Sequence, residues 1–112
     1  MSNYSIILHT VTTTGEAVRI DLLNTRKAAL VFRAINNKLR QQILKAIDEQ
    51  ESITVSQLCE KLFLEQSVAS QHLAVLRKAG FVKTFRKGKF IYYSVFADRL
   101  LEMNRIAADL TK

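Results

Sequence analysis

Apolar and polar positions along this chain of 112 residues follow two different periods, which divide the sequence into helices and strands. The first twenty residues are ambiguous, because a stretch rich in β-branched residues precedes a turn-like sequence at 12–15. They predict either a short hairpin or an irregular arm. Between residues 24 and 35, apolar side chains cover nearly the whole circumference of an expected helix, which Asn24 or Thr25 can cap.

Two further helices follow. Asn36 or Asn37 is expected to cap the second helix, whose apolar residues recur at helical spacing until residues 49–52 interrupt it. Thr54 and Gln57 form a capping-box pattern, in which each side chain bonds to the other's backbone amide, and this pattern predicts the start of a short third helix.

A fourth helix is followed by a change from helical to strand periodicity. Ser67 is expected to cap a helix that runs to Ala79, and Gly80 stands where a left-handed residue ends it. Beyond it, residues 81–85 and 90–95 are typical of strands, and Lys87-Gly88 fits a hairpin turn.

The last helix is expected at 98–111, started by Asp98 and carrying a broad apolar stripe. About five helices and a two-stranded hairpin predict a mainly α (α+β) winged helix-turn-helix fold. We expect residues 1–112 to form one such domain, with the helix-turn-helix at 54–79 and the wing at 81–96.

The apolar surface of the first helix predicts a dimer. A helix that is apolar all round must be buried on more than one side, and a chain of this length has little interior for it. We therefore expect helices 24–35 and 98–111 to form the subunit interface of a homodimer. The alternative is that the first helix lies centrally within one protomer.

Composition excludes several classes of protein. Hydrophobic residues make up 48% of the chain, which is enough for a core and argues against intrinsic disorder. No apolar run approaches the roughly 20 residues that span a bilayer, and the first four residues do not resemble a signal peptide. We expect a cytoplasmic protein without a membrane partner. Its single cysteine, Cys59, supplies neither an intramolecular disulfide nor a thiolate pair for zinc.

Positive charge is concentrated in one segment. The chain has 17 basic and 10 acidic residues, yet no acidic residue lies between Glu65 and Asp98. Such a segment attracts polyanions; a solubilising patch is the alternative. The basic residues in this segment are Arg77, Lys78, Lys83, Arg86, Lys87 and Lys89.

The outward side of the fourth helix suits a DNA major groove. Short hydroxyl and amide groups at its start fit base edges, and long cations at its end reach phosphates; an ordinary polar helix surface is the alternative. Gln71 is the main candidate for reading a base, since its amide can pair with adenine. His72 lies on the half-buried side, where we expect it to bond a backbone group or a phosphate. The candidate DNA-binding residues of this helix are Gln66, Ser67, Ser70, Gln71, His72, Arg77 and Lys78.

The hairpin turn strengthens this interpretation. Arg86, Lys87 and Lys89 crowd a few residues, where like charges repel, and nothing in folding requires that cost. A wing along the phosphate backbone explains it, because the charges are neutralised and counterions are released on binding. These three residues complete the candidate DNA-binding set, and double-stranded DNA is the expected partner.

The fourth helix also carries a family motif. Residues 66–80 read Gln-Ser-x-x-Ser-x-His-Leu-x-x-Leu-x-x-Ala-Gly, and with residues 32–44 and 88–94 they closely resemble the ArsR/SmtB family of bacterial repressors. The resemblance covers roughly residues 28 to 96. It implies a homodimer on a pseudo-palindromic operator, released by an inducer that is often a metal ion.

The family's sensing residues do not match. Thr54 and Ser56 stand where its metal sensors have a Cys-x-Cys pair, and hydroxyls are poor ligands for soft metals. The last helix, where other members place histidines, has none. We therefore expect no metal at either usual site and no cofactor. Cys59 is expected to be a buried structural cysteine, with an intermolecular disulfide as the alternative.

An enzyme is not expected, and no catalytic residue is assigned. His72 and His9 have no evident nucleophile or metal beside them, and the sequence contains no glycine-rich phosphate loop, carboxylate pair or metal-ligand cluster. The sequence thus predicts a sequence-specific DNA-binding transcriptional regulator, a homodimeric repressor without the usual metal sites. The alternative is a winged-helix module that binds a protein partner through its apolar helices.

Overall fold

The structure, a computed structural model, describes residues 5–112 and leaves residues 1–4 of the expected N-terminal arm outside the description. The chain divides into two compact units, one up to Phe32 and the other Arg33–Lys112. No helix among residues 5–112 is long and apolar enough to cross a bilayer.

The first unit contains an antiparallel hairpin that leads directly into a helix. Strands β1 (Ser5–Val11) and β2 (Ala17–Asp21) pair with an irregularity between Ile7 and Val11. The segment left open between a hairpin and an irregular arm therefore forms a hairpin, and its turn is closed by a bond from the Thr12 amide to the Glu16 carbonyl.

Helix α1 (Leu22–Ile35) begins earlier than expected. Neither Asn24 nor Thr25 caps it. Instead the Asp21 carboxylate accepts a hydrogen bond from the Asn24 backbone amide at 3.0 Å, while the Thr25 hydroxyl donates to the Asp21 carbonyl within the first turn. A carboxylate at this end satisfies a free amide and complements the positive end of the helix dipole.

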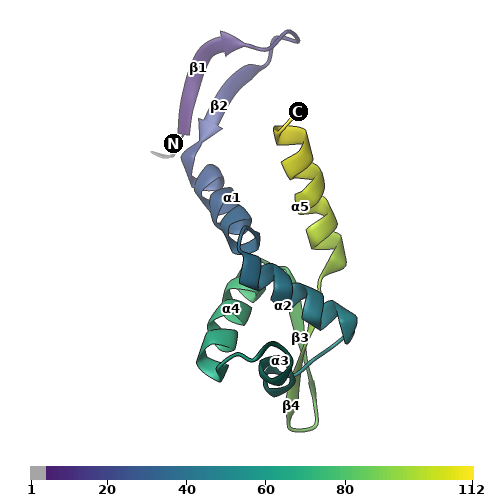
Figure 1. The fold of residues 1–112 in the computed structure, drawn as a ribbon. Helices are drawn as coiled ribbons and strands as arrows, with labels where there is room; N and C mark the ends of the chain where they lie inside the picture. The colour runs from purple at the N-terminus through teal and green to yellow at the C-terminus, as the bar shows by residue number, and fades with distance from the viewer. Residues whose placement is uncertain (1–4) are drawn as a thin grey trace. The chain divides into compact units, whose positions relative to one another are not determined.

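In the second unit, three short helices pack together (Figure 1): α2 (Lys38–Glu49), α3 (Val55–Leu62) and α4 (Gln66–Lys78). Asn37 caps α2 by accepting from the Arg40 amide at 2.9 Å, and Thr54 and Gln57 form both bonds of the expected capping box. The largest fully buried side chains are Phe81, Ile43, Ile47, Leu58, Leu73 and Leu76.

Helix α4 begins at Gln66, so the expectation that Ser67 caps it is wrong. The Glu65 carbonyl already accepts from the Ala69 amide at 3.0 Å, which starts the helical ladder there and leaves Ser67 inside the first turn. The preceding connection turns sharply, because Phe63 adopts a left-handed conformation with φ of 55°.

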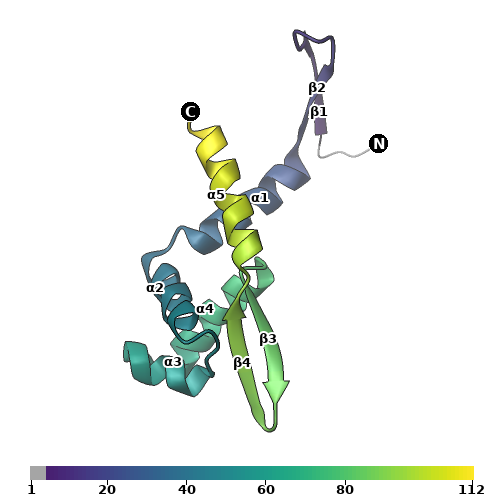
Figure 2. The same ribbon diagram turned by 90° about the vertical axis from the view of Figure 1, so that its right-hand side faces the viewer.

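The wing is a six-pair antiparallel hairpin of β3 (Val82–Lys87) and β4 (Phe90–Val95). Lys87 is paired with Phe90, so the turn consists of Gly88 and Lys89 rather than Lys87-Gly88. Strand β4 packs against α2 and α3, and Tyr93 exchanges two backbone bonds with Ile53, while the hairpin tip projects past the helices (Figure 2).

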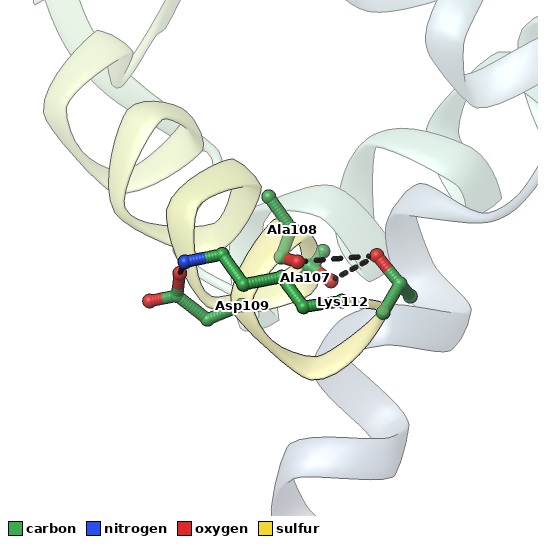
Figure 3. A network of polar contacts seen from close by, with 5 residues as sticks. Ala107, Ala108, Asp109 and Lys112 are labelled. Atoms are coloured by element: carbon green, nitrogen blue, oxygen red, sulfur yellow. Dashed lines mark hydrogen bonds and ion pairs between the residues drawn. The ribbon is translucent and has the colours of Figure 1, made fainter.

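Helix α5 (Ala97–Leu110) begins one residue before Asp98 and touches the core mainly near its start. Met103 is its one buried residue, and Arg99 donates from Nε to the Ala79 carbonyl at 3.2 Å. Its far end is closed by the Thr111 hydroxyl, which donates to the carbonyls of Ala107 and Ala108, and by an ion pair of Lys112 with Asp109 (Figure 3). The second unit is thus a winged helix-turn-helix, as predicted.

Gly80 provides a test of this packing. Its φ is +85°, its amide donates to the Arg77 carbonyl, and a Cβ there would lie 3.3 Å from Nε of Arg99. We expect Gly80→Ala to lower the free energy of unfolding by about 1–2 kcal/mol, through backbone strain and crowding of Arg99.

The matched control is Gly88→Ala. Gly88 also has a positive φ, but nothing lies within 4 Å of an added Cβ. In urea denaturation, Gly88→Ala should lower the free energy of unfolding by less than Gly80→Ala does. An equal loss for both variants would contradict a role for the contact with Arg99.

Candidate nucleic-acid interface

The predicted outward side of α4 is exposed. Ala69, Leu73 and Leu76 are buried on the opposite side, because they pack against the core at helical spacing. The exposed candidates on this helix are Gln66, Ser67, Ser70, Gln71, Arg77 and Lys78. Hydroxyl and amide groups therefore occupy the first two turns of the exposed side, and two cations occupy its end.

His72 is half-buried and makes a contact that the sequence did not reveal. Its Nδ1 lies 3.2 Å from Nη1 of Arg40, a residue 32 positions earlier at the start of α2. An arginine is always a donor, so Nδ1 accepts and the ring proton lies on Nε2. Burial, and secondarily the charge of Arg40, lower the pKa of His72 below its usual 6.5.

Arg40 joins three segments of the second unit. Besides His72, its guanidinium donates from Nε to the Ala34 carbonyl at 2.6 Å and from Nη2 to the Arg33 carbonyl at 3.0 Å. These carbonyls belong to the last turn of α1, where backbone acceptors have no helical partner. Arg40 therefore ties the end of α1 to the middle of α4. Periodicity could not predict this contact, because it depends on tertiary packing.

The cations of the wing are exposed at its tip. Arg86, Lys87 and Lys89 are all exposed, and Arg86 donates from Nε to the Gly88 carbonyl at 3.3 Å, which folds its side chain over the turn. The Lys89 ammonium lies 5.4 Å from the centre of the Phe90 ring. These contacts leave the charges uncompensated.

Ion pairs lie outside this region. Within residues 5–112 they join Lys61 to Glu49, Arg99 to Glu102 and Lys112 to Asp109. None of them involves a cation between positions 77 and 89. The cationic run, which we define as Arg77, Lys78, Lys83, Arg86, Lys87 and Lys89, thus has no carboxylate partner in the described chain.

The positions where the resemblance to the family places thiolates hold hydroxyl side chains in this chain. The Thr54 hydroxyl accepts from the Gln57 amide as the cap of α3, and Ser56 is exposed. Cys59 is half-buried, so the expectation of a buried cysteine is wrong: α3 turns Leu58 into the core and Cys59 to its margin. In the part of the chain that the structure describes, no three His, Cys, Asp or Glu side chains are grouped as metal ligands.

Comparison with known proteins bears on this arrangement. Residues 37–84, which contain α2, α3, α4 and the start of β3, match the family model described as bacterial regulatory protein, arsR family. An uncharacterized HTH-type transcriptional regulator from Methanocaldococcus jannaschii is 34% identical over 84 residues, which are 75% of this chain and 94% of that protein.

The chain belongs to the ArsR family. Other relatives include the transcriptional activator HlyU of Vibrio cholerae, which is 35% identical over 71% of this chain and 73% of HlyU. The transcriptional repressor SdpR of Bacillus subtilis is 34% identical over 58% of this chain and 71% of SdpR. The crystal structure of NolR from Sinorhizobium fredii superimposes with a TM-score of 0.66 at 27% identity, covering 92% of this chain and 96% of NolR. This ArsR-family protein is a DNA-binding transcriptional regulator, as the sequence predicted.

The lowered pKa of His72 predicts a pH dependence of stability. In the unfolded chain the imidazole takes up a proton near pH 6.5, whereas in the fold it resists protonation. The contribution of His72 to stability is therefore complete above about pH 6.5 and is lost as the pH falls below that value, by at most about 1.4 kcal/mol per pH unit.

We expect His72→Gln to lose less stability than the unsubstituted protein between pH 7.5 and 5.5, measured by urea denaturation. Gln71→Ala, which removes no titratable group from the same helix, is the control and should retain the original pH dependence. Identical pH profiles for the His72 variant and the unsubstituted protein would contradict a lowered pKa of His72 in the fold.

Proposed function

We propose that this ArsR-family regulator binds a pseudo-palindromic DNA operator as a homodimer and represses transcription, with the exposed side of α4 reading bases and the wing following the phosphate backbone. The observation that carries the proposal is the cationic run, which has no carboxylate partner within residues 5–112 and follows the polar first turns of α4 along the chain. A charge distribution of this kind is neutralised by a polyanion, with release of counterions.

The chemistry of α4 assigns different tasks to its two halves. Gln71 presents an amide that can bond both N6 and N7 of adenine, and Gln66, Ser67 and Ser70 lie close enough along the helix to share a groove. Arg77 and Lys78 reach phosphates from the last turn. His72, with its proton on Nε2, is oriented by Arg40 to donate to a phosphate.

Exposed apolar side chains support the homodimer. Helix α5 leaves Leu101, Ile106 and Leu110 exposed by 50%, 45% and 73%, and Leu30 of α1 is 57% exposed. Large apolar surfaces of this kind mark interaction sites. A two-fold dimer would place two copies of α4 in successive major grooves, about 34 Å apart.

The direction of regulation is also part of the proposal. SdpR is named a repressor and HlyU an activator, so both outcomes occur among the relatives. We propose repression, because a dimer that occupies two successive grooves excludes other proteins from the same DNA. The proposed setting is the cytoplasm, and no catalytic role is assigned.

Replacing the proposed base-reading amide tests sequence recognition. Gln71→Ala should weaken binding to the preferred site, selected from a random-sequence library, by about 1–3 kcal/mol and leave binding to unrelated DNA unchanged. Fluorescence anisotropy of labelled duplexes measures both. Equal losses on both duplexes would contradict base reading by Gln71, and absence of DNA binding by the unsubstituted protein at low salt would overturn the proposal.

A wing variant serves as the counterpart. Lys87→Ala should weaken binding to all duplexes alike and reduce the slope of log K against log salt by roughly 1 per subunit. Lys45→Ala, an exposed lysine on α2 outside the cationic run, is the matched control and should leave the slope unchanged.

The donor chemistry leads us to propose that the regulator does not sense metal at the usual thiolate site. Stoichiometric zinc or arsenite should not release it from DNA, because the hydroxyls of Thr54 and Ser56 are poor ligands for soft metals. The double variant Thr54→Cys with Ser56→Cys supplies the missing thiolates beside Cys59 and should gain a response. Release of the unsubstituted protein from DNA by either metal, followed by anisotropy, would overturn this proposal.

A further inference from the structure

The described residues of the first unit have little core of their own. From Ser5 to Phe32 every residue is exposed or half-buried. The β1–β2 hairpin (Figure 1) nevertheless carries five large apolar side chains with high exposure. They are Ile6 at 63%, Ile7 at 66%, Leu8 at 38%, Val11 at 57% and Ile20 at 47%.

These side chains occupy both faces of the hairpin. Ile6 pairs directly with Ile20, and these two side chains lie on one face of the hairpin. Ile7 pairs with Arg19 on the opposite face. An isolated two-stranded hairpin is only marginally stable in water, and one with apolar groups on both faces needs cover on both sides.

The apolar surface continues into α1 without a linker. Asp21 is both the last residue of β2 and the residue whose carboxylate accepts from the Asn24 amide at the start of the helix. Leu22 and Leu23 follow at 44% and 43% exposure, and Leu30 lies two turns further on. The hairpin and the first turns of α1 therefore present one connected surface, which lies outside residues 37–84 that match the family model.

We propose that this hairpin is a dimerisation arm that packs against a second copy of the same chain. The inference rests on the homodimer of the proposed function and extends its interface from α1 to the hairpin. Eight half-exposed side chains of roughly 90 Å² each amount to about 700 Å² per subunit, close to the contribution of one partner to a stable interface. A two-fold arrangement covers both arms at once, because each partner brings the same surface.

Charge argues against nucleic acid as the occupant of this surface. Between Ser5 and Leu30 the charged residues are Glu16, Arg19, Asp21, Arg26 and Lys27, three bases against two acids. A polyanion is attracted only weakly to such a surface, whereas the cationic run of α4 and the wing attracts it. A surface that is apolar and nearly neutral suits association with its own copy, because little charge has to be desolvated there.

The test compares two full-length double variants of equal charge. Ile6→Lys with Ile20→Lys places two cations on the apolar face, and Thr10→Lys with Thr13→Lys places two cations on the same hairpin at exposed polar positions. Sedimentation equilibrium should show a dimer dissociation constant raised at least about tenfold in the isoleucine variant and little changed in the threonine control.

A second measurement does not depend on how the variants fold. In a mixed dimer of methyl-labelled and unlabelled unsubstituted chains, isotope-filtered NOEs should connect the methyl groups of Ile6, Ile7 and Ile20 to the unlabelled partner. A stable dimer that lacks these NOEs, or equal dissociation constants for both variants, would overturn the proposal that the hairpin is a dimerisation arm. Neither result would contradict the proposed homodimer. A monomer at all concentrations would instead overturn the homodimer itself.

Discussion

The packing of α4 onto α2 and α3 is the constraint on which the rest of this molecule depends. Leu73 and Leu76 are almost completely buried, and with Phe81 they fix the rotation of α4 about its own axis. Residues three and four positions apart share a face of a helix, so Ala69, Leu73 and Leu76 are buried together, and Gln71, two positions before Leu73, is turned to the exterior. The exposure of the proposed base-reading side of α4 thus follows from the burial of apolar residues on its other side.

Local signals in the sequence predicted most of the second unit. The capping box of Thr54 and Gln57, the left-handed Gly80 and the two strands of the wing each follow from interactions among residues close in sequence. The predicted starts of α1 and α4 were wrong by one or two residues. In both cases an acidic residue, Asp21 or Glu65, precedes the helix, whereas an amide or hydroxyl side chain was expected to cap it. At Asp21 the carboxylate accepts from an amide, and at Glu65 the backbone carbonyl alone starts the ladder.

Other features could not be predicted, because they depend on contacts far apart in the chain. The bond between Arg40 and His72 joins residues 32 positions apart, and no periodicity indicates it. The half-buried state of Cys59 depends on how deeply α3 sits against its neighbours. The subunit interface expected from the apolar residues of 24–35 stays a prediction; in the structure Leu30 of this stretch is exposed, and further exposed apolar side chains lie in the hairpin at residues 5–21.

The three hydrogen bonds of Arg40 have a mechanical consequence. One planar guanidinium group binds the carbonyls of Arg33 and Ala34, in the last turn of α1, and the imidazole in the middle of α4. A displacement of the last turn of α1 relative to α4 would therefore have to break at least one of these three hydrogen bonds.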